Sequence, residues 1–259
     1  MSVGVAVITR EGIAVAADTI GEIYEHEDFD NENGGVLPFK RPYVSLGGHH
    51  KMWAGERCAV VFCTSGSSMG DKLKEYFLRL ASIQYEKVEP SHAVATLRPL
   101  LQNADPNVSI SCLVVGYDST EVGPIARAHM FTKPPGHGPK SNLREGQPAP
   151  MMGDKDNLEN GSMAVVGQWE YLLRLSANLE WAGMSFPAMD LSKLGLQQAV
   201  DLCGLYIDHC ARWQRLSQGF AKIGAPYDLC IMRPGEDAQY ATLGEISDAL
   251  TGGLRRINM

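Results

Sequence analysis

The sequence predicts an α+β fold in which antiparallel sheets are covered by helices. An apolar, β-rich hairpin opens the chain, with strands expected over residues 3–9 and 13–17 around the turn "REG". Later strands and helices come in runs instead of strict alternation, which favours antiparallel sheets over a parallel one. The 259 residues are enough to bury a substantial core, so we expect one domain over residues 1–259.

The elements of the first half follow from their residue patterns. Residues 21–48 are acidic and aromatic with no sustained period, which predicts a loop or a distorted hairpin. "CAVVFCTSG" (58–66) predicts a strand that ends in small residues, and helical spacing of apolar side chains predicts a helix over 67–83. A second helix is expected over 91–103, where Pro99 can kink or shorten it.

The second half is expected to begin with a strand hairpin, 108–118 and 125–132, followed by a surface connection rich in Pro and Gly over 133–162. Further elements are then expected in this order: a strand at 162–167, a helix at 168–183, a long helix or two at 191–216, a final strand at 226–235 and a short helix from 241.

Charge and hydropathy exclude several classes of protein. The chain has 23 basic and 30 acidic residues and no concentrated Lys or Arg cluster, which argues against nucleic-acid binding. No stretch of about 18 apolar residues is present, and Arg10 and Glu11 interrupt the pattern of a secretory signal. We therefore expect a cytoplasmic protein with neither a nucleic acid nor a membrane as partner.

No cofactor or metal is expected. The six cysteines are scattered through apolar segments without a C-x-x-C pair, which is typical of buried core thiols. His49 and His50 are adjacent, and adjacent residues of a strand point to opposite faces, so they are interpreted as loop histidines.

The opening "MSVGVAVITREGIAVAADTI" places Asp18 sixteen positions after Ser2, at the end of the second expected strand. Together with the element order, this segment resembles the proteasome β-subunit-like branch of the N-terminal nucleophile (Ntn) hydrolases. The resemblance implies a four-layer αββα sandwich, the Ntn hydrolase or proteasome-subunit fold. It also implies that Ser2 becomes the first residue once Met1 is removed, because a free α-amine with a pKa of about 7.7–8.0 can then deprotonate the hydroxyl.

The resemblance also assigns roles to other residues. Asp18 and Lys51 stand where the family has an aspartate and a lysine beside the nucleophile, and a lysine ammonium there lowers the pKa of the nucleophile. Ser65 and Gly66 occupy the turn whose backbone N–H binds the oxyanion. The candidates for orienting the α-amine are Asp208 and Ser217.

Each residue also has an alternative interpretation without catalysis. Serine after an initiator methionine is common, Asp18 can begin a turn, and Lys51 can be a solvated charge. Asp208 can be an exposed helix residue. "VVGQWEY" provides Gly167 but no serine where the family has a Gly-Ser-Gly turn, which favours a non-catalytic member.

The implied function is hydrolysis of peptide bonds through an acyl-enzyme, in a proteasome-like, threonine-type peptidase that uses a serine nucleophile. Its partners would be a peptide or unfolded protein as substrate, further copies of the chain in a homo-oligomeric ring and an ATP-dependent unfoldase. Two alternatives stay open: a non-catalytic structural subunit of the same fold, and an amidohydrolase for a small non-peptide substrate.

Overall fold

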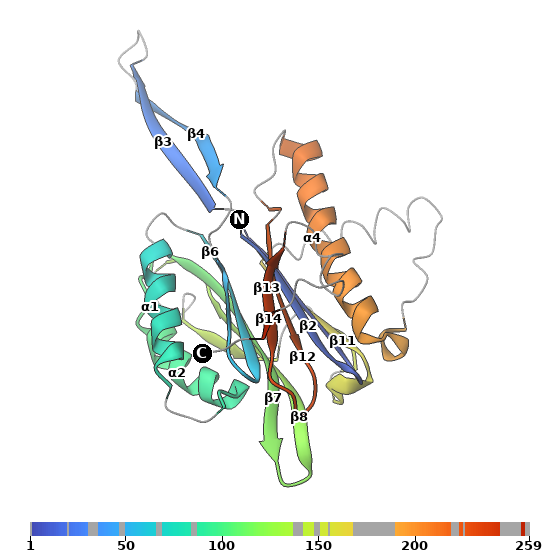
Figure 1. Cartoon of the computed structure of the whole chain (residues 1–259). Coiled ribbons are helices and arrows are strands. Elements are labelled where there is room, and N and C mark those ends of the chain that lie inside the picture. The colour runs from blue at the N-terminus through green and yellow to red at the C-terminus, as the bar shows by residue number, and fades with distance from the viewer. Residues whose placement is uncertain are drawn as a thin grey trace.

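A computed structural model gives a β-rich fold with two antiparallel sheets, a two-stranded ribbon and three α-helices among the described residues (Figure 1). The structure describes residues 2–19, 21–30, 36–46, 50–65, 69–83, 87–136, 142–147, 151–154, 156–167, 190–218, 223–224, 226–243 and 255–256.

The larger sheet has seven strands and places the amino-terminal hairpin near its centre. In spatial order its strands are β10 (Met151–Gly153), β11 (Ser162–Gly167), β1 (Val3–Thr9), β2 (Gly12–Asp18), β12 (Tyr227–Met232), β13 (Gln239–Leu243) and β14 (Arg255–Arg256). Both β1 and β2 are buried along their whole length, as expected for strands without a polar face. The hairpin is therefore enclosed by neighbours on both edges and both faces.

The smaller sheet has five strands, in the order β5 (Met52–Ala54), β6 (Cys58–Ser65), β7 (Ser109–Thr120), β8 (Gly123–Lys133) and β9 (Arg144–Gly146). A separate ribbon is formed by β3 (Gly21–Asp30) and β4 (Val36–Leu46), with an irregular register between Ile23 and Tyr24. Figure 1 shows this ribbon projecting beyond the sheets, from the end of the molecule where β1 begins.

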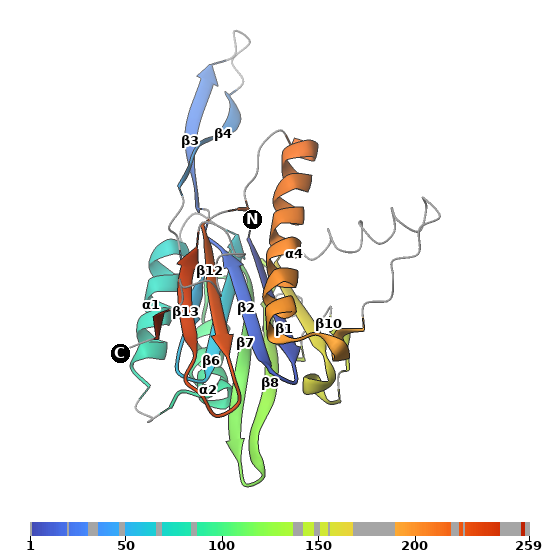
Figure 2. The same cartoon turned by 45° about the vertical axis from the view of Figure 1, so that its right-hand side comes forward.

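The described helices cover the outer faces of the sheets. Helix α4 (Leu196–Gln218) packs on β1 and β2, and Glu11 accepts a hydrogen bond from the first helical N–H, that of Leu196, at 2.8 Å. Helices α1 (Met69–Ala81) and α2 (Pro90–Gln102) lie on the smaller sheet, as Figure 2 shows from a second angle. Two short 3₁₀ helices are η2 (Leu158–Asn160) and η3 (Leu191–Lys193).

The inner faces of the two sheets share one hydrophobic cluster. Ala6 and Ile8 of β1 contribute to it from the larger sheet, and Val61 and Leu113 from the smaller sheet. The sheets approach closely at Gly4, where a Cβ would lie 2.4 Å from Val61 Cγ1. The apolar residues of both sheets therefore fix the spacing between them near the start of β1.

The structure corrects the expected four-layer αββα sandwich to a β-rich fold. Residues 21–46, expected as a loop or distorted hairpin, form the long ribbon β3–β4, and the expected connection over 133–162 contains β9 and β10. These short strands add to sheet edges by backbone hydrogen bonds, so their sequences carry little side-chain pattern. The helix expected over 168–183 lies outside the described residues, which leaves α4 as the α-helix described on the larger sheet.

Other expectations have mixed outcomes. The structure confirms the hairpin β1–β2, the helices α1, α2 and α4, and the hairpin β7–β8. All six cysteines are buried and free, as expected for core thiols. The short helix expected from 241 is wrong over its first residues, because β13 continues to Leu243. The expectation of one domain over 1–259 stays a prediction.

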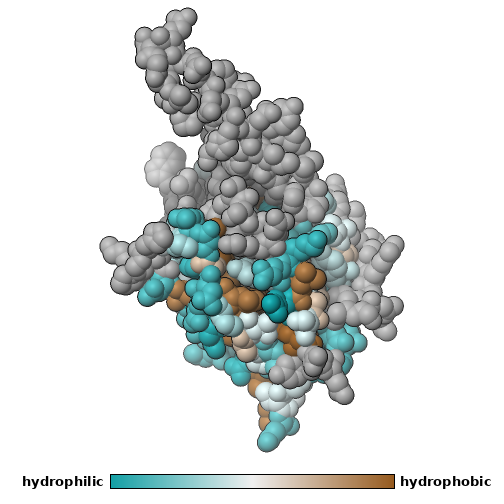
Figure 3. Space-filling model, turned by 90° about the vertical axis from the view of Figure 1, so that its left-hand side faces the viewer, coloured by the Kyte–Doolittle hydropathy of each residue, from teal (hydrophilic) through white to brown (hydrophobic). Residues whose placement is uncertain are grey.

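The described surface mixes polar and apolar side chains. Figure 3 shows hydrophobic residues in brown lying among hydrophilic residues in teal on one face. The large hydrophobic side chains that are exposed in the described part are Leu78, Val122, Leu205 and Leu216. No helix among the described residues is long and apolar enough to cross a membrane.

Leu113→Ala should lower the free energy of unfolding by about 2–5 kcal/mol, because it leaves a cavity in the cluster between the sheets. Leu216→Ala is the matched control, since Leu216 is 85% exposed on α4 and its truncation should cost less than about 0.5 kcal/mol. Urea denaturation of both variants measures the difference. Equal losses would contradict the placement of Leu113 in a close-packed core.

Candidate active site

Ser2 lies directly before β1 and is 7% exposed. The residue that follows it, Val3, is paired with Gly167 of β11 on one side, and β2 borders β1 on the other. The serine is therefore held at the end of an enclosed strand, where the two sheets approach each other.

Asp18 is the last residue of β2, and its buried carboxylate links two groups. Oδ1 accepts a hydrogen bond from the Val3 N–H at 2.8 Å, and Oδ2 binds the Lys51 ammonium at 2.6 Å. The exposed fractions of the two side chains are 0% for Asp18 and 9% for Lys51. Because buried charges are retained only when they are paired, this carboxylate fixes Lys51 close to the backbone of the residue after Ser2.

Lys51 reaches Asp18 from the side of the smaller sheet. It lies immediately before β5, and its carbonyl accepts a hydrogen bond from the Phe62 N–H of β6 at 2.8 Å. Asp18 belongs to the larger sheet, so the ion pair joins the two sheets beside Ser2.

Burial raises the pKa of the Asp18 carboxyl, and the Lys51 ammonium and the Val3 N–H oppose that rise. Cys63 of β6 is also close to this pair, and burial together with the charge of Asp18 raises the pKa of its thiol well above the usual range. A thiol that stays neutral is a poor nucleophile.

Gly167 ends β11 and lies against Ser2. Its φ of +86° is in the region that favours glycine, and a Cβ there would lie 2.1 Å from the Ser2 carbonyl oxygen and 2.8 Å from Cys63 Sγ. Glycine is required here by both the conformation and the close approach of the two backbones.

For the other expected site residues, the structure shows fewer contacts. Ser65 ends β6 with its backbone opposite Ser109, and Gly66 lies outside the described residues. Asp208 is exposed on α4 and accepts a hydrogen bond from the Tyr227 hydroxyl at 2.5 Å, and Tyr227 is the strand partner of Asp18. Ser217 lies near the end of α4. Their catalytic roles stay predictions.

Sequence reasoning missed a second buried carboxylate, Asp228 of β12. It accepts hydrogen bonds from the Tyr240 hydroxyl at 2.7 Å and the Thr242 hydroxyl at 2.8 Å, and its Oδ1 lies 3.0 Å from His50 Nδ1. His50, expected as a loop histidine, therefore has a specific partner. The available signal was an aspartate inside the apolar strand "YDLCIM", because a buried aspartate needs donors.

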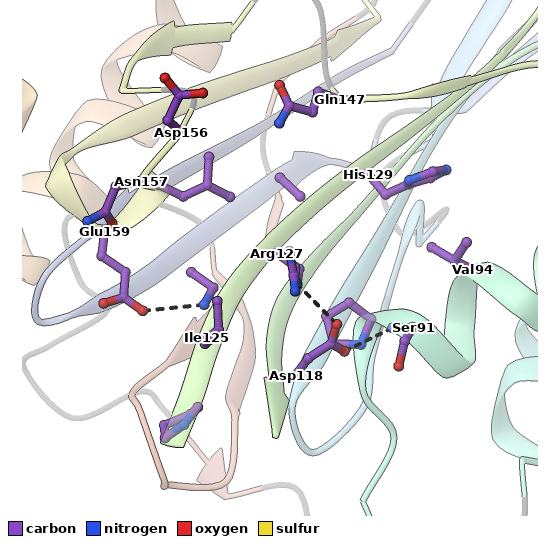
Figure 4. A pocket seen from close by; sticks show the side chains of 15 residues that line it. Ser91, Val94, Asp118, Ile125, Arg127, His129, Gln147, Asp156, Asn157 and Glu159 are labelled. Atoms are coloured by element: carbon purple, nitrogen blue, oxygen red, sulfur yellow. Dashed lines mark hydrogen bonds and ion pairs between the residues drawn. The ribbon is translucent and has the colours of Figure 1, made fainter. Parts of the chain in front are cut away.

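A separate pocket of about 610 Å³ lies between α2, β8 and η2 (Figure 4). Asp118 at its wall accepts a hydrogen bond from the Ser91 N–H and pairs with Arg127, whose Nε lies 3.5 Å from Oδ2. Glu159 accepts from the Ala126 N–H at 3.3 Å. Asp118 and Arg127 therefore pair with each other, and none of the expected site residues lines the pocket.

In the part of the chain that the structure describes, no three or more His, Cys, Asp or Glu side chains are grouped so that they could hold a metal ion.

Comparison with known proteins relates the fold to Anbu proteins. An Anbu mutant (Gly-1) from Hyphomicrobium sp. strain MC1 is 13% identical, covers 97% of this chain and 94% of its own, and has a TM-score of 0.51. Anbu (ancestral beta-subunit) from Yersinia bercovieri is 14% identical, covers 99% of this chain and 86% of its own, and has a TM-score of 0.44. No family model and no curated protein matches the sequence.

These findings correct the family suggested by the sequence. Assignment to the proteasome β-subunit-like Ntn hydrolases is not supported by any family model or curated relative. The comparison supports a fold similar to that of Anbu, at an identity too low to carry an activity across. The likeness therefore shows the fold alone, and the chemistry of the site depends on its own residues.

Lys51→Met should lower the free energy of unfolding by about 3–5 kcal/mol near neutral pH, because it leaves the Asp18 carboxylate buried without its cation. The loss should shrink as the pH falls, since burial raises the pKa of Asp18 and its protonation removes the unpaired charge. Urea denaturation across pH measures both effects.

The matched control is Lys87→Met. Lys87 pairs with Asp237 at 2.7 Å, but the side chains are 38% and 58% exposed, so its loss should cost about 0–1 kcal/mol. A Lys51→Met loss as small as that of the control would contradict a buried, tightly coupled pair.

Gly167→Ala should reduce the rate at which acylating reagents modify Ser2 by at least about tenfold, because the new methyl group displaces the Ser2 backbone. Gly235→Ala is the control: its φ is +79°, and no atom lies within 4 Å of the added Cβ. It shares the conformational strain but should leave Ser2 acylation unchanged. Equal acylation of both variants, measured by intact mass, would show that Gly167 does not position Ser2.

Proposed function

We propose that this protein is a hydrolase that uses Ser2 as an amino-terminal nucleophile and cleaves peptide bonds through an acyl-enzyme. The observation that carries the proposal is the buried Lys51–Asp18 pair, which Asp18 joins to the amide of Val3, directly after Ser2. The proposal requires cleavage of the bond between Met1 and Ser2, because only then is the Ser2 α-amine free to act as a base.

In the first half-reaction, the Ser2 α-amine takes the hydroxyl proton while Oγ attacks the substrate carbonyl carbon. The Lys51 ammonium, held by Asp18, contributes a fixed positive charge that favours the developing alkoxide. The tetrahedral intermediate then loses its amine, which takes the proton from the α-ammonium, and the acyl group remains as an ester on Ser2.

The turn that follows β6 is proposed to supply the oxyanion-binding N–H. Ser65 and Gly66 are the residues predicted for this turn, and preorganised donors of this kind lower the barrier by about 3–4 kcal/mol. Water then hydrolyses the ester and restores the Ser2 hydroxyl.

The proposed substrate is an unfolded polypeptide or peptide, and the proposed assembly is a cytoplasmic homo-oligomeric ring whose inner chamber contains Ser2. An ATP-dependent unfoldase would supply the substrate. The likeness in fold to an Anbu protein supports this assembly.

Intact mass spectrometry before and after exposure to a β-lactone tests the proposal. The purified protein should lack the mass of Met1 and gain a single adduct, which peptide mapping should place on Ser2. Ser2→Ala should form no adduct, and Ser2→Thr should keep one because it retains a hydroxyl at the same position. Retention of Met1 with no adduct would contradict the proposal and favour a non-catalytic structural subunit.

A panel of fluorogenic peptide amides and small non-peptide amides should then define the substrate class. Turnover of peptide amides that is absent in Ser2→Ala would support the peptidase. Turnover of the small amides alone would indicate a small-molecule amidohydrolase in which Ser2 is still the nucleophile.

A further inference from the structure

Two neighbouring residues of one segment bind two carboxylates on neighbouring strands. Lys51 binds Asp18 of β2, and His50 binds Asp228 of β12. Strands β2 and β12 are paired, with Asp228 opposite Ala17, the residue before Asp18. His50 is therefore the neighbour of Lys51 along the chain, and its partner Asp228 lies across the sheet from the residue before Asp18.

The hydrogen bonds around Asp228 determine the tautomer of His50. Burial and the nearby Asp228 charge raise the pKa of Tyr240 well above its usual range, so its hydroxyl keeps its proton and donates to the carboxylate. Thr242 donates to the same oxygen at 2.8 Å. With Asp228 ionised, the contact with His50 is made by an Nδ1–H that donates, which leaves the lone pair of neutral imidazole on Nε2.

The exposed fractions of these side chains show which group meets water. Asp228 is 0% exposed, whereas the His50 side chain is 53% exposed. Within the described residues, the hydrogen bonds recorded for His50 are all made by its anchored Nδ1. The Lys51 side chain, in contrast, is 9% exposed, and its Nζ donates to Asp18.

We propose that His50, oriented by Asp228, is the general base for the water that hydrolyses the acyl-enzyme, an inference that rests on the proposed function of Ser2. Nε2 takes a proton as the water oxygen bonds to the ester carbonyl carbon. The bond from that carbon to Ser2 Oγ then breaks, and His50 returns the proton to Oγ. The products are a carboxylic acid and the free Ser2 hydroxyl, and Asp228 acts as a positioning residue throughout.

The test separates formation of the Ser2 adduct from its hydrolysis. Wild type, His50→Ala and Asp228→Asn are acylated with a β-lactone, excess reagent is removed, and the adduct is followed by intact mass. His50→Ala should be acylated within about twofold of the wild-type rate, and its adduct should persist about 10²–10⁴-fold longer. Added imidazole should restore hydrolysis, since the half-exposed site is open to solvent.

Asp228→Asn should also slow hydrolysis more than acylation, because an amide no longer selects the Nδ1–H tautomer. His129→Ala is the control, since His129 lies on β8 in the separate pocket, and its adduct should hydrolyse at the wild-type rate. Thermal unfolding of each variant confirms that it is folded.

The outcomes distinguish this inference from the proposed function. A His50→Ala adduct that hydrolyses as fast as wild type, or slowly but without rescue by imidazole, would overturn the role of His50 and leave Ser2 as the nucleophile. Absence of any wild-type adduct on Ser2 would overturn the proposed function and this inference together.

Discussion

The buried ion pair between Lys51 and Asp18 is the constraint on which the amino-terminal site depends. It joins the two sheets, and through Oδ1 of Asp18 it also holds the amide of Val3 at 2.8 Å. Neither charge can be buried alone without a large desolvation penalty, so each fixes the position of the other. The close contact of Gly4 with Val61 and of Gly167 with Ser2 leaves this end of β1 little freedom to move.

A second pair joins His50, the residue before Lys51, to the buried carboxylate of Asp228. The Lys51 side chain is buried against Asp18, whereas the His50 side chain is half-exposed. In the proposed reaction the two pairs serve different steps. The Lys51–Asp18 pair is proposed to favour alkoxide formation at Ser2, and the His50–Asp228 pair to favour removal of a proton from water.

Local sequence patterns predicted the helices and strands that depend on the residues of a single segment. The hairpin β1–β2 follows from two apolar, β-rich runs around a turn. Asp18 and Lys51 were found through the family resemblance, Asp18 from its spacing to Ser2 and Lys51 from its distance before the small-residue turn at 65–66. Residues 21–48 were expected as a loop or a distorted hairpin, and the short strands β9 and β10 were not predicted. These strands are held by backbone hydrogen bonds to their neighbours, which leave little pattern in the side chains. Asp228 and His50 are 178 residues apart, and only the packed sheets bring them together. The expected layers and family were wrong because both extended a local likeness to the whole chain.

A crystal structure of the β-lactone adduct would test the central claim most directly, because it shows the modified atom, the Lys51–Asp18 ion pair and the His50–Asp228 contact in one map. The account predicts continuous density from Ser2 Oγ to the acyl carbonyl, with Lys51 still bound to Asp18 and its Nζ within about 3 Å of the ester oxygens. Density on any other side chain, or a Lys51 ammonium that has left Asp18 and points away from Ser2, would contradict it.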